Sequence, residues 1–171
     1  MAHRHLILGG ARSGKSRLAE QQAERIAAAD GRQLIYLATA TAGDQEMQLR
    51  ILRHQADRKQ HWRTIEQPLE LGAELRKLRS EQCVLIDCLT LWLSNCLHED
   101  CWQVQKQAFL GALDDCPADV LMVSNEVGSG IVPLGELSRQ FVDEIGWLHQ
   151  ALAAEADQVT QVIAGLARPL K

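Results

Sequence analysis

Several features that would assign this 171-residue chain to a function class are missing from its sequence. No apolar run approaches the roughly twenty residues that a membrane-spanning helix needs. The formal net charge is −4, so the chain has no general attraction for nucleic acid, and any polyanion must be bound by a local basic cluster. Internal repeats and low-complexity segments are also absent. We therefore expect one globular domain over residues 1–171, with no membrane span and no nucleic-acid partner.

The cysteines form no C-x-x-C pair, and no histidine accompanies them at a spacing that suggests zinc. The five are Cys83, Cys88, Cys96, Cys101 and Cys116. Their odd number favours free thiols that pack as small apolar groups. The N-terminal residues lead directly into an apolar run that predicts a strand, so we expect a cytoplasmic protein.

The most informative stretch covers residues 5–16, with the sequence H-L-I-L-G-G-A-R-S-G-K-S. It predicts a short strand, a glycine-rich turn and the first turn of a helix. Within it, Gly9, Gly14, Lys15 and Ser16 match the phosphate-binding pattern G-x-x-x-x-G-K-[ST] in the strand and helix context that the pattern requires. Glycines let the backbone N–H groups surround an anion, and the helix start adds its unpaired amides. The alternative, a turn that only caps a helix, does not explain the lysine and serine.

An acidic residue at the end of a later strand fits the same site. Residues 83–87, C-V-L-I-D, form a continuous apolar run that ends in Asp87, as expected for a buried parallel strand. Lys15 can reach the outer phosphates of a nucleotide, while Ser16 and Asp87 can ligate Mg²⁺. Without the phosphate loop, Asp87 would equally suit an ordinary cap at a strand end.

The order of the expected elements predicts an α/β fold. Strands are expected at the N-terminus and over residues 33–38, 83–87, 119–124 and 159–164, with residues 62–66 extended. Helices are expected over residues 16–29, 44–61, 69–79, 89–97, 102–113 and 136–156. This alternation predicts a P-loop NTPase-like (RecA-like) domain with a mostly parallel central sheet flanked by helices.

The expected helix over residues 44–61 carries a cluster of basic side chains. Arg50, His54, Arg58 and His61 share one face, and Asp57 is the only acid between residues 50 and 63. A bound polyphosphate needs counter-charge beyond the phosphate loop, so the cluster is a candidate anion site. A solvated basic face is the alternative. A second candidate region is the apolar loop over residues 125–133, which can close over a ligand and contains Glu126.

Taken together, these motifs resemble the bifunctional adenosylcobinamide kinase / adenosylcobinamide-phosphate guanylyltransferase family of cobalamin biosynthesis. The resemblance rests on G-G-A-R-S-G-K-S at 9–16, Y-L-A-T-A at 36–40, E-M-Q-L-R-I-L-R-H-Q-A-D-R at 46–58, W-R-T-I-E at 62–66, V-L-I-D-C-L-T-L-W-L-S-N at 84–95, S-N-E-V-G-S-G-I-V-P at 124–133 and A-G-L-A-R-P-L-K at 164–171. The R-I-x-x-H-x-x-x-R pattern at 50–58 and the N-E-V-G-x-G-I-V-P segment are far more specific to this family than the phosphate loop. Two departures, Lys59 after Arg58 and Arg168 before Pro169, touch no expected catalytic atom.

The resemblance implies two reactions. ATP or GTP phosphorylates the hydroxyl group of adenosylcobinamide, and GTP then gives GMP to a histidine, which passes it to adenosylcobinamide phosphate. The guanylylated histidine falls on His54, and Lys15 is the other catalytic residue. Nucleotide contacts fall on Gly9, Gly10, Ala11, Arg12, Ser13, Gly14, Lys15, Ser16, Ala38, Thr39, Ala40, Gln55, Ala56, Asp57, Arg58, Glu66 and Asp87. The family also suggests a homo-oligomer, a trimer.

The residue chemistry agrees with these roles. A neutral imidazole is a nucleophile at pH 7, and Arg50 and Arg58 can neutralise charge on the phosphorus that His54 attacks. Glu126 is a candidate for orienting or deprotonating the attacking hydroxyl. One phosphate loop is present, so we expect both half-reactions to use one nucleotide site in turn. Two alternatives remain: a single-function P-loop small-molecule kinase, and a nucleotide-dependent binding or regulatory module.

Overall fold

The computed structural model describes residues 2–41 and 61–171. The helix expected over residues 44–61 falls almost entirely on the rest of the chain. Arg50, His54, Gln55, Ala56, Asp57 and Arg58 therefore lie outside the described residues.

Seven strands form one sheet in the order β3-β2-β4-β5-β1-β6-β7, and six of them are parallel. Their bounds are β1 Arg4–Gly9, β2 Gln33–Ala38, β3 Trp62–Glu66, β4 Gln82–Asp87, β5 Asp119–Asn125, β6 Gln158–Ile163 and β7 Leu166–Pro169. The phosphate-loop strand β1 lies between β5 and β6, although these are distant from it in the sequence. The predicted α/β fold with a mostly parallel sheet is confirmed.

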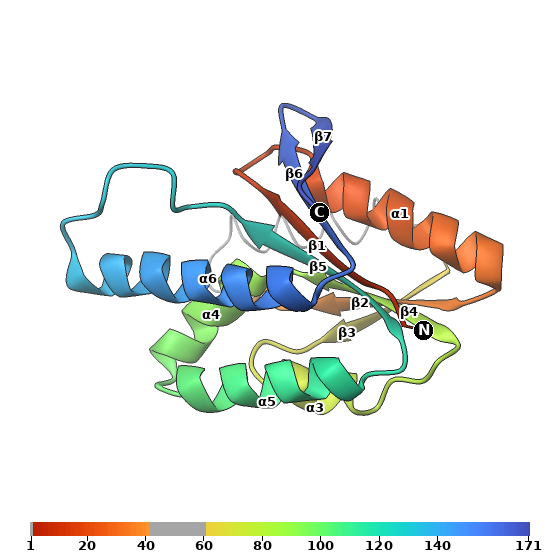
Figure 1. Cartoon of the computed structure of the whole chain (residues 1–171). Helices are drawn as coiled ribbons and strands as arrows, with labels where there is room; N and C mark the ends of the chain where they lie inside the picture. Colours follow the sequence, from red (N-terminus) through yellow and green to blue (C-terminus); the bar gives the residue numbers. More distant parts are fainter. Residues whose placement is uncertain (1, 42–60) are drawn as a thin grey trace.

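Helices cover both faces of this sheet (Figure 1). Their bounds are α1 Lys15–Asp30, α3 Leu71–Leu75, α4 Leu89–His98, α5 Trp102–Asp115 and α6 Glu136–Glu155. Helix α1 packs on one face and the other described helices pack on the opposite face. None of the described helices combines the length and the apolar character needed to cross a membrane.

The core explains why the central strands read as apolar runs. In β4, Val84 and Ile86 pack with α3 to α6, whereas Cys83 and Leu85 pack with α1. Alternate residues of a strand point to opposite faces, so a sheet covered on both sides needs apolar residues at every position. The five cysteines are free thiols, and all except Cys101 are buried, as predicted.

Two predicted boundaries were wrong. Residues 69–79 were expected to form one helix, but α3 covers only Leu71–Leu75. Gln67 Oε1 accepts hydrogen bonds from the N–H groups of Leu69 and Glu70, which delays the helix start. The helix then tightens into a turn, in which the N–H groups of Lys77 and Leu78 donate to the carbonyls of Glu74 and Leu75, and it ends at Leu75.

The second correction concerns the C-terminal strands. Residues 159–164 were expected as the closing strand, whereas β6 is followed by β7 in an antiparallel hairpin. Ala164 and Gly165 form the turn between them, with φ angles of 51° and 79°. Two consecutive left-handed residues are the signature of the type I′ turn that joins neighbouring antiparallel strands.

A buried carboxylate joins α5 to α6. Glu144 accepts hydrogen bonds from Trp102 Nε1 at 2.6 Å, Lys106 Nζ at 2.9 Å and Gln103 Nε2 at 3.0 Å. Burial alone would raise the pKa of Glu144, but these hydrogen bonds and the Lys106 charge outweigh it and hold the pKa below its usual value. Both oxygens of this carboxylate are therefore satisfied by α5.

Candidate active site

The phosphate loop connects β1 to α1 at the carboxyl end of β1. Gly14 immediately precedes the helix with φ 95°, a conformation that favours glycine. The next residue, Lys15, begins α1, so the N–H groups of the first helical turn border the loop. These are the groups that bind phosphate at a helix start. The strand, loop and helix predicted for residues 5–16 are confirmed.

Lys15 lies along the inside of this loop. Its Nζ donates a hydrogen bond to the carbonyl of Gly10 at 3.0 Å, and the residue is buried. Burial lowers the pKa of Lys15, and the charges of Asp87 and Cys88 oppose that effect. The side chain is thus held over the loop within electrostatic reach of Asp87.

The first glycine of the loop is packed too tightly for a side chain. A Cβ atom on Gly9 would lie 2.4 Å from Ser13 Oγ and 2.7 Å from the backbone oxygen of Val162 in β6. The hairpin turn also reaches the loop, because the N–H of Gly165 donates to the carbonyl of Ser13 at 2.8 Å. Sequence reasoning missed this contact, whose only local signal is the Ala164-Gly165 pair.

We expect Gly9→Ala to lower stability by about 1–3 kcal/mol, since the extra methyl group must displace β6 or the loop. Thermal unfolding without nucleotide measures the effect. Gly111→Ala is the matched control, because Gly111 is exposed in α5 and a Cβ there meets nothing within 4 Å. Alanine should raise stability slightly at that position. Equal melting temperatures for the Gly9 variant and the unaltered protein would contradict the packing described.

Asp87 ends β4 with one carboxylate oxygen engaged. The Tyr36 hydroxyl donates to Asp87 Oδ2 at 2.8 Å, which holds the carboxylate in one orientation. Within residues 2–41 and 61–171, Oδ1 has no hydrogen-bond partner and can ligate a cation. Carboxylate and hydroxyl oxygens are the donors that Mg²⁺ accepts, so Asp87 and Ser16 are chemically suited to hold it beside a bound polyphosphate.

Thr39 fastens the loop after β2 to the end of β4. Its side chain is fully buried, and its Oγ1 donates to the carbonyl of Cys88 at 2.7 Å and accepts from the Cys88 N–H at 2.8 Å. The carbonyl of Thr39 accepts from Asn95 Nδ2 in α4. Thr39 therefore supports this edge of the sheet, whereas Ala38 and Ala40 beside it are only half-buried.

Glu66, at the end of β3, is exposed at the same edge of the sheet. Its backbone partner in the neighbouring strand is Ala38, so these two predicted nucleotide-binding residues are adjacent. Because β2, β3 and β4 are parallel, the end of β3 lies at the same carboxyl edge of the sheet as Asp87.

Glu126 follows β5, and its carboxylate is bonded within its own loop. Its Oε1 accepts from the N–H of Gly128 at 2.7 Å. Ser124, two residues earlier, bonds through Oγ to His149 Nε2 of α6 at 2.7 Å. Burial lowers the pKa of His149 to about 4, and the Glu126 charge opposes this shift. Glu126 therefore lies near α6, whereas the phosphate loop leads into α1 on the other face.

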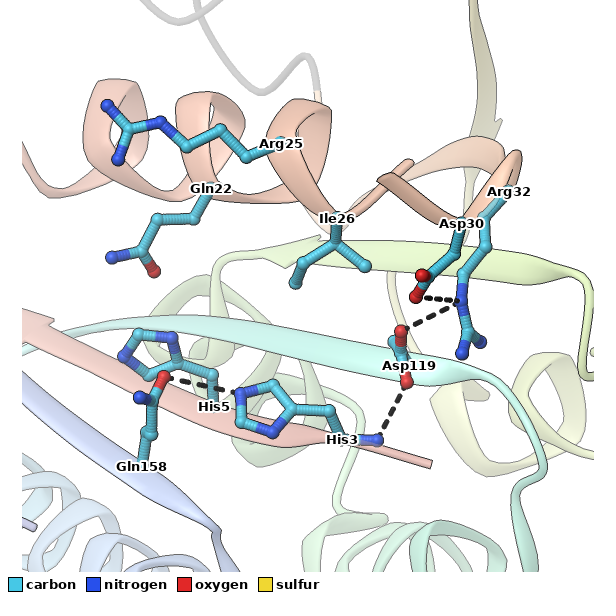
Figure 2. A pocket seen from close by; sticks show the side chains of 9 residues that line it. All are labelled: His3, His5, Gln22, Arg25, Ile26, Asp30, Arg32, Asp119 and Gln158. Carbon is cyan, nitrogen blue, oxygen red and sulfur yellow. Dashed lines mark hydrogen bonds and ion pairs between the residues drawn. The ribbon is translucent and has the colours of Figure 1, made fainter. Parts of the chain in front are cut away.

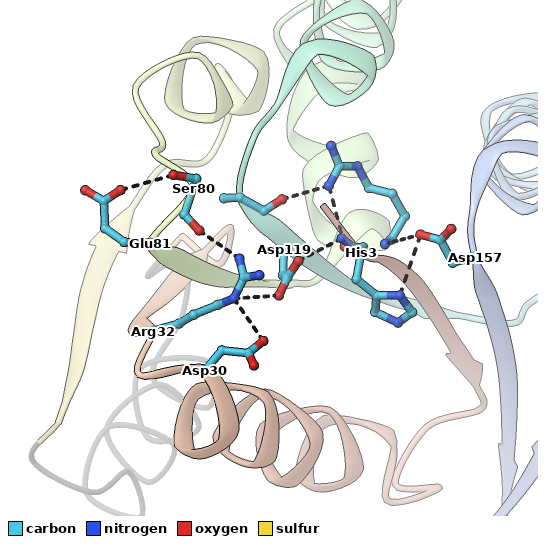
Figure 3. A network of polar contacts seen from close by, with 9 residues as sticks. His3, Asp30, Arg32, Ser80, Glu81, Asp119 and Asp157 are labelled. Carbon is cyan, nitrogen blue, oxygen red and sulfur yellow. Dashed lines mark hydrogen bonds and ion pairs between the residues drawn. The ribbon is translucent and has the colours of Figure 1, made fainter. Parts of the chain in front are cut away.

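A separate cavity of about 430 Å³ lies at the amino end of the strands, between α1 and the starts of β1, β5 and β6 (Figure 2). Three of its charged side chains, Asp30, Arg32 and Asp119, are already paired with one another. Arg32 Nε lies 3.1 Å from Asp119 Oδ2 and 3.4 Å from Asp30 Oδ2, and Asp119 Oδ1 accepts from the N–H of His3 (Figure 3). His5 bonds to Thr160, and burial followed by the charge of His3 lowers its pKa to about 4. We therefore place the candidate active site at the carboxyl edge.

The family model for cobinamide kinase / cobinamide phosphate guanyltransferase matches residues 5–170. The chain belongs to this family. It is 55% identical over 172 residues to the bifunctional adenosylcobalamin biosynthesis protein CobP of Pseudomonas aeruginosa, covering 98% of this chain and 97% of that protein. It is 37% identical to the bifunctional adenosylcobalamin biosynthesis protein CobU of Escherichia coli, covering 97% and 98%. The family resemblance stated from the sequence is confirmed.

Solved structures support the fold independently. A KaiC-like protein from Pyrococcus horikoshii matches with a TM-score of 0.52 and 13% identity, over 93% of this chain and 70% of that one. The flagellar accessory protein FlaH from Methanocaldococcus jannaschii matches with a TM-score of 0.52 and 12% identity, over 99% and 78%. At these identities the likeness shows the fold alone. This confirms the RecA-like P-loop architecture for this family member.

Proposed function

We propose that the protein phosphorylates adenosylcobinamide with ATP or GTP and then transfers GMP from GTP, through His54, to give adenosylcobinamide-GDP. The observation that carries this proposal is the family match, because it spans both the phosphate loop and the histidine segment. The loop, Lys15 and Asp87 supply the groups that phosphoryl transfer requires.

In the first reaction, the hydroxyl oxygen of adenosylcobinamide bonds to the γ-phosphorus as the bond to the β,γ-bridging oxygen breaks. The nucleoside diphosphate leaves, and the hydroxyl proton passes to a base or to water. Lys15 and the N–H groups that start α1 stabilise the charge on the phosphoryl oxygens. Ser16 and Asp87 would hold Mg²⁺, which would supply positive charge beside the outer phosphates.

In the second reaction, an imidazole nitrogen of His54 bonds to the α-phosphorus of GTP and pyrophosphate leaves. A phosphate oxygen of adenosylcobinamide phosphate then bonds to the same phosphorus, which releases the imidazole. The covalent intermediate divides one difficult transfer into two easier ones. Arg50 and Arg58, each four residues from His54, would neutralise charge in both steps.

Labelling with GTP that carries the label in its α-phosphate tests the intermediate. We expect the unaltered protein to acquire an acid-labile, alkali-stable label and the His54→Ala variant to acquire none. His54→Ala should still phosphorylate adenosylcobinamide at close to the normal rate, because imidazole takes no part in that reaction. His98→Ala is the matched control, since His98 is exposed at the end of α4 and should leave labelling intact.

The outcomes separate the alternatives. An unaltered protein that phosphorylates adenosylcobinamide without being labelled would be a single-function kinase. Nucleotide binding without either product would indicate a regulatory module. Equal loss of both activities in His54→Ala would contradict the division of labour between His54 and the phosphate loop.

We further propose that the chain forms a homo-oligomer, a trimer by resemblance to its family. Apolar side chains in the segment between β5 and α6 support an interface there, since Ile131 and Leu134 are each 98% exposed. Light scattering coupled to size-exclusion chromatography measures the assembly, and a monomer at micromolar concentration would contradict it.

A further inference from the structure

Asn125 ends the strand that lies between the two halves of the candidate site. On one side, β5 pairs with β4, and Asp87 is opposite Val123. On the other side, β5 pairs with β1, and Gly9 is opposite Asn125. Asn125 therefore lies beside the first glycine of the phosphate loop and two residues beyond the partner of Asp87.

Strand alternation determines which face its side chain occupies. Leu121 and Val123 pack with α1, while Ser124 bonds to His149 of α6 on the other face. Asn125 follows Ser124, so its side chain falls on the α1 face. Asp87 has the same parity as Leu85, which also packs with α1. Asn125 and Asp87 thus share the face where α1 begins with Lys15.

Hydrogen bonds hold the backbone at Asn125, but none holds its side-chain carboxamide among the described residues. Its N–H donates to Thr90 Oγ1 at 3.4 Å, and the N–H of the next residue, Glu126, donates to the carbonyl of Gly9 at 3.0 Å. In the described part of the chain, the half-buried Asn125 carboxamide has no hydrogen-bond partner. Half-buried amides in ordered strands usually have one.

A terminal phosphate is the ligand that this position suits. The loop holds the inner phosphates, and lysine and the metal-binding carboxylate act on the outer ones. The outermost phosphate therefore belongs between Lys15 and Asp87, above the end of β5. A carboxamide offers two N–H donors without charge, whereas a carboxylate there would repel the anion.

We propose that Asn125 Nδ2 donates a hydrogen bond to a non-bridging oxygen of the terminal phosphate of the bound nucleoside triphosphate. This assignment rests on the proposed function and deepens it, because it names a phosphate-sensing residue absent from the sequence-based candidates. Glu126, whose carboxylate accepts from the N–H of Gly128 in its own loop, is not assigned this role.

The test compares triphosphate and diphosphate affinities by titration calorimetry with Mg²⁺, using β,γ-imido-GTP and GDP. A hydrogen bond to a charged group corresponds to about tenfold to hundredfold in affinity. We expect Asn125→Ala to lower the affinity for β,γ-imido-GTP by that factor and the affinity for GDP by less than about threefold. Asn125→Asp should weaken the triphosphate further through repulsion. The kinase kcat should also fall more than the rate of His54 labelling, because only the kinase transfers the terminal phosphoryl group.

Asn95→Ala is the matched control, because Asn95 lies at the same edge but its Nδ2 already donates to the carbonyls of Thr39 and Pro68. Any loss there should be equal for the two nucleotides. Equal losses for both nucleotides in the Asn125 variants, or no loss, would overturn the assignment and leave the proposed function standing. Failure of the unaltered protein to bind either nucleotide would overturn both.

Discussion

Lys15→Met is expected to lower the rates of adenosylcobinamide phosphorylation and of His54 labelling by about 100-fold to 1,000-fold. Methionine keeps most of the buried stem but removes the charge and the hydrogen bond that Nζ makes to Gly10 at 3.0 Å. Both reactions build negative charge on phosphoryl oxygens in the loop, so both need this cation. Steady-state assays of each product measure the effect.

Lys77→Met is the matched control for this change. Lys77 is 68% exposed and pairs with Glu74 at 2.7 Å, and exposed pairs of this kind contribute little. Its rates should stay within about twofold of the unaltered protein. If Lys15→Met retained one activity and lost the other, the two reactions would not share one phosphate-binding loop, and the single-site proposal would be wrong.

Glu144→Ala is expected to cost about 3 kcal/mol of unfolding free energy, because it leaves Lys106 and the indole N–H of Trp102 without their acceptor. For a chain of this length the melting temperature should fall by about 6–12 °C. Glu155→Ala is the control, since Glu155 is exposed at the end of the same helix and should change stability by less than about 0.5 kcal/mol. Similar melting temperatures for the two variants would contradict the role of Glu144.

The contribution of Glu144 to the free energy of unfolding should also depend on pH. Its folded-state pKa lies below the usual value of 4.5, so the stabilisation is fully present above that value and is lost as pH falls through the lower folded pKa. The stability gap between the unaltered protein and Glu144→Ala should therefore be constant from pH 7 to about pH 5.5 and shrink in more acidic solution. Denaturant unfolding at several pH values measures this gap.

Sequence patterns predicted those elements that are determined by residues close together in the sequence. The phosphate loop follows from a strand, three glycines and a helix start within residues 5–16, and the buried strands follow from their apolar runs. The hairpin strand β7 is exposed and carries no such run, so only the Ala164-Gly165 turn could have indicated it. The start of α3 depends on hydrogen bonds from the N–H groups of Leu69 and Glu70 to the Gln67 side chain, which periodicity does not detect.

The relation between Asn125 and the loop depends on pairing between distant strands. The pattern of residues 119–124 predicts a strand but not its neighbours, so the register that sets Gly9 opposite Asn125 appears only in the folded sheet. Glu126 was the more prominent candidate from sequence because a carboxylate suggests base chemistry. Glu126 instead lies beyond the end of β5, where its carboxylate accepts a hydrogen bond from the N–H of Gly128 in its own loop.

The first strand of the sheet, β1, pairs with two strands that lie far along the sequence, β5 and β6. Both edges of β1 are closed by segments synthesised more than a hundred residues later, starting at Asp119 and at Gln158. During translation the apolar segment His5–Leu8 has no neighbours with which to complete its backbone hydrogen bonds. Contacts of such long sequence separation also slow folding and prolong exposure to aggregation. The packing around Gly9 also includes the backbone of Val162, so the phosphate loop reaches its final form only once β6 is in place.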